Sequence, residues 1–108
     1  MSRVPLRIAA ALAGALALAG AVAADAPARA SIIIDGTRYD PATLTVKRGA
    51  TIAFVNKDPF PHTATAPGTF DSKEIAAGKT WTYKAAKAGR FDYICTLHPN
   101  MKGTLIVE

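Results

Sequence analysis

"RFDYICTLHPNMKGTLIVE" (residues 90–108) contains the pattern that decides the fold of this chain. Its first six residues are rich in aromatic and apolar side chains, as expected of a β-strand. Alternate residues of a strand share one face, so Phe91, Tyr93 and Cys95 should point together into a core. The pattern therefore places Cys95 at the inward end of a core strand.

A turn must follow this strand, because a second apolar run, "GTLIVE", ends the chain. Pro99 disfavours helical backbone at His98 and biases that residue toward extended geometry. Gly103 permits the chain to reverse into the last strand. We therefore predict a loop over residues 96–102, between two neighbouring strands at one end of the structure.

The preceding part of the chain has the same character. Short runs of β-branched and aromatic residues are separated by Gly and Pro, and no window of ten residues has a helical period. About seven short strands are predicted, with the earlier ones at residues 31–35, 43–47, 51–56, 62–66 and 80–85. The fourth of these also fits an extended loop. The spacing is typical of an all-β fold, a small Greek-key β-sandwich or barrel.

The N-terminal 30 residues have the layout of a secretory signal peptide. Arg3 and Arg7 precede an uncharged apolar run at 8–24, and small-residue cleavage patterns follow. Cleavage is expected after residue 24 or after residue 30, which leaves a single domain at 31–108 exported to the periplasm. The alternative is retention of the run as a membrane anchor, although it is short for a span.

The charge of the domain is modest. Residues 31–108 hold ten Lys and Arg against seven Asp and Glu, a net charge of +3. No basic run or basic–aromatic stretch is present, so the sequence does not predict nucleic-acid binding. A mild positive charge is compatible with docking to an acidic partner.

Soft metal ligands are few and gathered together. After the leader the chain has one cysteine, two histidines and one methionine: Cys95, His62, His98 and Met101. Taken singly, each has an ordinary interpretation, as a small buried hydrophobe, a packing residue or a loop histidine. However, a single thiol in an oxidising compartment is a liability unless it is buried or bound. Two imidazoles, a thiolate and a weak axial thioether form the blue copper donor set, so we predict one copper ion and favour it over zinc.

The stretches "FDYICTLHPNM" and "GATIAFVNKDPFPHTA" resemble the cupredoxin, or type 1 blue copper, family. The interval C-x2-H-x2-M is similar to the short ligand loop of amicyanin. The resemblance implies His62, Cys95, His98 and Met101 as the copper ligands. It also implies that Asn56, just before the loop that leads to His62, ties that loop by hydrogen bonds to the Cys95 side, which orients the ligands.

The same resemblance implies a monomeric periplasmic carrier that cycles between Cu(I) and Cu(II) and is not an enzyme. Electrons would pass through the exposed edge of His98 to redox proteins such as a periplasmic dehydrogenase or a c-type cytochrome. An apolar patch around that edge is expected from Pro59, Phe60, Pro61, Pro67, Leu97 and Pro99.

Two other functions compete with electron transfer. A copper chaperone or resistance protein would bind the ion and pass it on, but such sites tend to be rich in Met or His. An enzyme with Cys95 as nucleophile and His98 as base would need a third, orienting group and a pocket, and it would leave Met101 unexplained.

Overall fold

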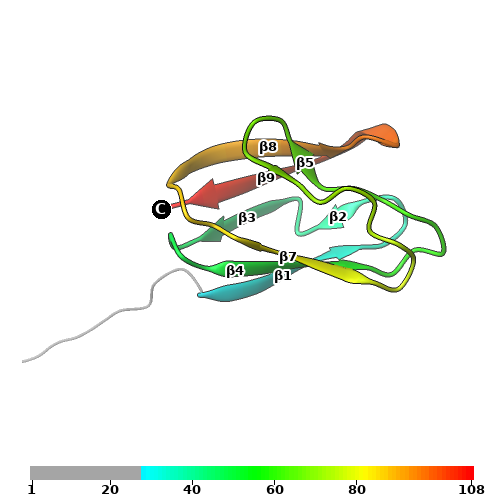
Figure 1. Cartoon of the computed structure of the whole chain (residues 1–108), viewed down its shortest axis with the longest axis horizontal. Coiled ribbons are helices and arrows are strands. Elements are labelled where there is room, and N and C mark those ends of the chain that lie inside the picture. The colour runs from blue at the N-terminus through cyan, green and yellow to red at the C-terminus, as the bar shows by residue number, and fades with distance from the viewer. Residues whose placement is uncertain (1–27) are drawn as a thin grey trace, which may run out of the picture.

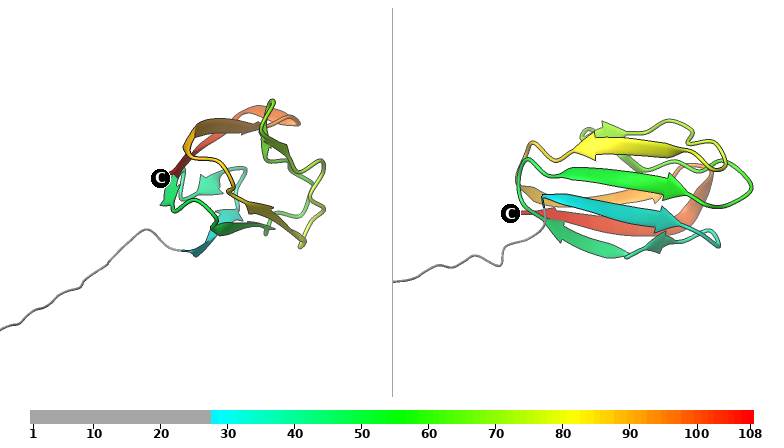
Figure 2. Two further views of the ribbon diagram at one scale, coloured as in Figure 1. Left: turned by 60° about the vertical axis from the view of Figure 1, so that its left-hand side comes forward. Right: turned by 90° about the horizontal axis from the view of Figure 1, so that it is seen from below.

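The computed structural model describes residues 28–108, which form two mixed β-sheets packed face to face (Figures 1 and 2). The first sheet has the order β2 (Tyr39–Asp40), β1 (Arg29–Ile34), β4 (Thr51–Asn56) and β7 (Thr80–Lys84). The second has the order β3 (Thr43–Val46), β9 (His98–Val107), β8 (Gly89–Cys95), β5 (Thr65–Ala66) and β6 (Phe70–Asp71). The predicted leader lies almost entirely outside the described residues. Within 28–108 no helix is long and apolar enough to cross a membrane.

The predicted all-β sandwich is confirmed, but the described residues contain nine strands rather than about seven. The additional strands β2 and β6 have two residues each, too few to show an alternating pattern. The predicted strand 62–66 is wrong in extent, because only Thr65 and Ala66 are paired in β5. His62 instead makes an isolated bridge to Ile75.

The core lies between the two sheets and follows the period-two pattern of the strands. Ile52 and Phe54 are buried on β4, and Tyr93 and Cys95 are buried on β8. An aromatic cluster joins the layers, with the Tyr39 and Phe54 rings packed edge-on against Tyr93 at centroid distances of 4.7 and 5.5 Å. Burial of each such ring stabilises the fold by about 1.5–3 kcal/mol.

The predicted loop over residues 96–102 is wrong. Strand β8 reverses in a two-residue turn at Thr96 and Leu97, and β9 already begins at His98. Cys95 pairs with His98 after a register shift that follows Ile94. Residues 99–101 have no partner on β8, and the ladder resumes with the pair of Cys95 and His98. His98 is extended, as expected from the proline that follows it.

Gly103 has a different role from the one predicted. It lies inside β9 opposite Tyr93, and the chain does not reverse there. A Cβ built on Gly103 would overlap the Tyr93 ring. Glycine is therefore required by the close approach of an aromatic ring from the neighbouring strand.

Three turns meet at one end of the sandwich, as the views in Figures 1 and 2 show. Strands β1 and β4 are parallel and in register from Arg29 with Thr51 to Ile34 with Asn56, so both end there. The β8–β9 turn lies at the same end. The loop after β4 carries His62, and the β8–β9 hairpin carries Cys95, His98 and Met101.

Candidate metal centre

Three of the four predicted ligands converge. Ligand atoms of His62, Cys95 and His98 all lie within 4.8 Å of one another. The Cys95 Sγ lies 3.7 Å from Nδ1 of His62 and 3.9 Å from Nδ1 of His98. Metal bonds of about 2.0 Å to nitrogen and about 2.3 Å to sulfur, at 120°, place N and S about 3.7 Å apart. The spacing therefore suits a trigonal metal ion better than direct hydrogen bonds.

Cys95 is held at the buried end of β8. Its side chain is fully buried, which confirms the inward strand phase, and it is a free thiol. The backbone N–H of Thr63 donates a hydrogen bond to Sγ at 3.3 Å. This bond fixes the position of the sulfur from the core side.

His62 is fixed from two sides. Its backbone forms both hydrogen bonds of the bridge with Ile75, and its side chain is fully buried. The ring Nε2 lies 2.7 Å from Oδ2 of Asp58, so Nε2–H donates a hydrogen bond to the carboxylate. This leaves Nδ1 as the nitrogen that faces Cys95.

Asp58 was not singled out by the sequence analysis. It is buried, and its carboxylate also accepts the backbone N–H groups of Gly36 and Thr37 at 2.7 and 2.9 Å. Burial opposes ionisation, but the hydrogen bonds from Thr37, Gly36 and His62 outweigh it and lower the pKa of the carboxyl below its usual value. An acidic residue four positions before a candidate ligand was a usable signal, but the partner turn is more than twenty residues away.

His98 is the solvent-accessible member of the cluster. Its ring lies 5.1 Å from the His62 ring and 6.0 Å from that of Phe60, measured between centroids. Phe60 and Leu97 are the exposed large apolar residues of the described chain. The predicted prolines at positions 59, 61, 67 and 99 are exposed as well. An accessible imidazole edge thus lies beside apolar surface.

Met101 is buried on β9, three residues beyond His98. It lines a pocket of about 430 Å³ together with Thr37, Leu97, His98, Pro99 and Asn100. The methionine therefore lies on the ligand hairpin and lines the same pocket as His98 and Thr37 of the β1–β2 turn.

Asn56 is fully buried, but its hydrogen bonds differ from those expected. Its Nδ2 donates to the carbonyl oxygens of Phe60 and Ile75, and its Oδ1 accepts the N–H of Asp58. These bonds hold the loop after β4 and tie it to the segment that contains Ile75. The link to the Cys95 side is made by Thr63.

Thr63 was also missed by the sequence analysis. In addition to its bond to Cys95, its Oγ1 accepts the backbone N–H of Thr96 at 2.9 Å. The Tyr39 hydroxyl donates to the Thr63 carbonyl oxygen at 2.5 Å. Burial, and next the neighbouring Cys95 and Tyr93, raise the pKa of the Tyr39 hydroxyl. Thr63 thus holds the two ligand segments together from the core side.

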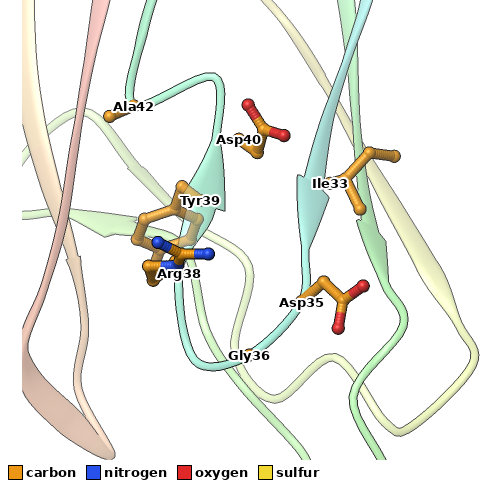
Figure 3. Close-up of a pocket in the computed structure, with 7 residues that line it drawn as sticks. All are labelled: Ile33, Asp35, Gly36, Arg38, Tyr39, Asp40 and Ala42. Carbon is orange, nitrogen blue, oxygen red and sulfur yellow. The ribbon is translucent and has the colours of Figure 1, made fainter.

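A pocket of about 630 Å³ is lined by none of the three converging donors. It lies beside the β1–β2 hairpin, where Figure 3 shows Gly36 on the turn and Tyr39 on β2. Its side chains include Asp35, Arg38 and Asp40. The donor atoms, and not this pocket, therefore indicate the position of the candidate metal site.

Comparison with known proteins agrees with this geometry. The family model described as a cupredoxin-like domain matches residues 8–107. The chain belongs to the cupredoxin family. It is 32% identical to an amicyanin of Paracoccus denitrificans over 113 residues, covering 88% of this chain and 83% of the relative.

Two solved structures extend the comparison. The reduced Cu(I) form of an amicyanin mutant at pH 4 superimposes with a TM-score of 0.69 and 26% identity, covering 77% of this cupredoxin and 85% of that chain. A copper-containing nitrite reductase of Thermus scotoductus gives the same TM-score and identity over 74% of this chain, but the match spans only 22% of that enzyme. The likeness to the enzyme is thus confined to one part of it.

The residues present fit copper. A His–Cys–His–Met set is present, and three of its donors have trigonal spacing. Thiolate and thioether are soft ligands that favour Cu(I), whereas imidazole suits both oxidation states. The protein is therefore an amicyanin-like blue copper protein with the donor set of a type 1 centre.

Proposed function

We propose that this cupredoxin shuttles single electrons between redox proteins in the periplasm, with His62, Cys95, His98 and Met101 as the ligands of one copper ion. The convergence of two Nδ1 atoms on one buried thiol, at the spacing of a trigonal site, carries the proposal. Bound copper supplies the one-electron Cu(I)/Cu(II) couple.

The protein contributes rigidity. The His62 backbone is pinned by Ile75, and Cys95 is held at the end of a seven-residue strand and by Thr63. His98 begins a ten-residue strand that pairs back onto β8. Ligands fixed in this way move little when the ion changes oxidation state, so electron transfer carries a small reorganisation cost.

Electrons enter and leave through His98. Its side chain is accessible, whereas His62 and Cys95 are fully buried and shielded from water. Exposed Phe60 and Leu97 beside it suit a small, transient contact of the kind that redox partners make. The partners proposed are a periplasmic dehydrogenase or a c-type cytochrome. Lys57 and Lys102 are exposed and favour an acidic surface on the partner, and the carrier acts as a monomer.

We further propose export by the N-terminal signal peptide, with cleavage after residue 24 in preference to residue 30. Arg29 and Ala30 pair with Thr51 and Ile52 in the β1–β4 ladder. Cleavage after residue 30 would remove these two residues from the strand, whereas cleavage after residue 24 leaves β1 whole.

The site favours a carrier over the two competing functions. An enzymatic nucleophile must meet its substrate, and the Cys95 side chain has no exposed surface. A copper-transfer site needs accessible donors for handing on the ion, and here His62, Cys95 and Met101 are all buried.

Titration of the purified, metal-free protein with Cu(II) tests the proposal. One equivalent should give an intense blue colour from thiolate-to-copper charge transfer and a type 1 EPR signal. The Cys95→Ser variant should bind without that colour, which provides the matched control. A colourless wild-type protein that selects zinc would overturn the carrier function.

A further inference from the structure

Asp58 stands out among the residues around the metal centre. Its carboxylate is 6% exposed, yet it receives hydrogen bonds from the Gly36 N–H, the Thr37 N–H and Nε2 of His62. Three donors aimed at one buried carboxylate favour its ionised form. A negative charge therefore lies one imidazole ring away from the position of the metal.

The β1–β2 turn is shaped to hold this charge. Gly36 and Thr37 have φ angles of +64° and +59°, so both lie in the left-handed region. Threonine is β-branched and rarely adopts this conformation. Successive residues in such a turn direct their N–H groups to one side and form an anion-binding concavity, here filled by Asp58. Asp58, the hydrogen-bond partner of His62, thus joins the loop after β4 to the β1–β2 turn, which lies more than twenty residues earlier.

We propose that Asp58 is a positioning residue for the metal: it fixes the His62 tautomer that presents Nδ1 to the ion, and its charge favours Cu(II) over Cu(I). The inference rests on the proposed function. Neutral imidazole has one N–H and one lone pair. Because the carboxylate accepts a hydrogen bond from Nε2–H, the proton stays on Nε2 and the lone pair is left on Nδ1, 3.7 Å from Sγ of Cys95.

The simpler alternative is that Asp58 only tethers the loop after β4 to the β1–β2 turn. A tether would contribute to stability. It would not affect which ring nitrogen of His62 carries the proton, and it would not change the relative affinities for Cu(I) and Cu(II). A carboxylate partner of a ligand histidine fixes the tautomer and orientation of the ring, and it also makes the imidazole a more basic ligand. The two roles therefore separate experimentally.

The first test uses the metal-free protein and does not depend on copper binding. Two-bond ¹H–¹⁵N correlation NMR of the wild type should show His62 as a single Nε2–H tautomer. In Asp58→Ala the share of the Nδ1–H tautomer should rise several-fold, while the backbone shifts of the Ile75 bridge stay in place. An unchanged tautomer in a folded Asp58→Ala protein would overturn the positioning role.

The second test uses Asp58→Asn, which keeps an oxygen for His62 and removes the charge. Its Cu(II) affinity should fall by about 10- to 100-fold, more than its Cu(I) affinity. Each tenfold difference between the two raises the reduction potential by about 59 mV. Asp92→Asn is the matched control, because it removes a charge from a side chain that is 70% exposed and should leave the potential unchanged. A potential for Asp58→Asn equal to that of wild type would contradict the electrostatic part of the proposal.

These outcomes remain distinguishable from failure of the function itself. If the wild-type protein does not turn blue with Cu(II), the carrier function fails, and the tautomer of the metal-free protein still decides whether Asp58 positions His62. If the protein turns blue and neither Asp58 variant changes tautomer or potential, the carrier stands and Asp58 is a tether alone.

Discussion

Replacement of Gly103 by alanine should destabilise the protein by packing rather than by backbone strain. The added Cβ would meet the hydroxyl end of the Tyr93 ring, including Cζ and the oxygen. Tyr93 is fully buried between the sheets, and its ring also packs against Tyr39 and Phe54. The ring therefore cannot rotate into open space, and the hairpin must shift to relieve the overlap.

The expected cost follows from overpacking of a dense core, about 1–3 kcal/mol. For a domain of this size each kcal/mol lowers Tm by about 4–8 °C. Urea unfolding of metal-free Gly103→Ala and wild type, followed by far-UV circular dichroism, measures the difference directly. Strands β8 and β9 carry three of the proposed ligands, Cys95, His98 and Met101, so weaker copper binding should accompany the loss of stability.

A second substitution separates packing from backbone conformation. The Tyr93 hydroxyl is buried and has no hydrogen-bond partner among residues 28–108, so Tyr93→Phe should be neutral or stabilising by about 1 kcal/mol. It also removes one atom that the new Cβ meets. The Gly103→Ala/Tyr93→Phe protein should recover part of the loss, with a coupling of at least about 0.5 kcal/mol. Strict additivity, or a harmless Gly103→Ala, would refute this reasoning.

Three further predictions concern the axial ligand, alkaline pH and the N-terminal strand. Met101→Gln should keep copper and lower the reduction potential, because an amide oxygen is a harder ligand than a thioether, and Met101→Leu should raise the potential. Cyclic voltammetry of both variants checks this. Potentials equal to that of the wild type would contradict an axial role. Because the pKa of Tyr39 is raised in the folded state, unfolding releases a proton above pH 10, and stability should fall there by up to about 1.4 kcal/mol per pH unit. Comparing unfolding curves of metal-free Tyr39→Phe and wild type between pH 9 and 11 tests this, since the variant should have the shallower slope. A chain that begins at Ser31 should have a free energy of unfolding about 1–3 kcal/mol lower than a chain that begins at Asp25. The shorter chain lacks the pairing of Arg29 and Ala30 with β4 and the hydrogen bond from the Thr51 N–H to the Ala28 carbonyl. Equal midpoints in urea unfolding would count against cleavage after residue 24.

The strand phase around the ligand segment could be predicted because it depends on local rules. The period of two placed Cys95 inward beside Tyr93, and the proline after His98 made that residue extended. The length of the loop predicted at 96–102 could not be obtained from these local rules. Whether residues after Leu97 pair with β8 depends on the partner strand, and the structure continues the ladder to His98.

Short strands and the supporting residues were missed for a related reason. Two-residue strands such as β2 and β6 exist only because a neighbouring strand presents free hydrogen-bonding groups. Asp58 and Thr63 look like ordinary loop residues in the sequence. Asp58 lies only four positions from His62, but the segments to which Asp58 and Thr63 tie the ligands lie 21 to 33 positions away along the chain. No local pattern encodes such distances.

The sequence by itself determined the chemistry of the donors and the direction in which Cys95 points. Residue types are covalent facts, and side-chain alternation follows from the geometry of a single strand. Only the tertiary structure decided that Nδ1 of His62 and Sγ of Cys95, 33 residues apart, lie 3.7 Å from each other. That distance is set by the parallel pairing of β1 with β4 and by the packing of two sheets across a dense core, where the position of each side chain depends on all of its neighbours.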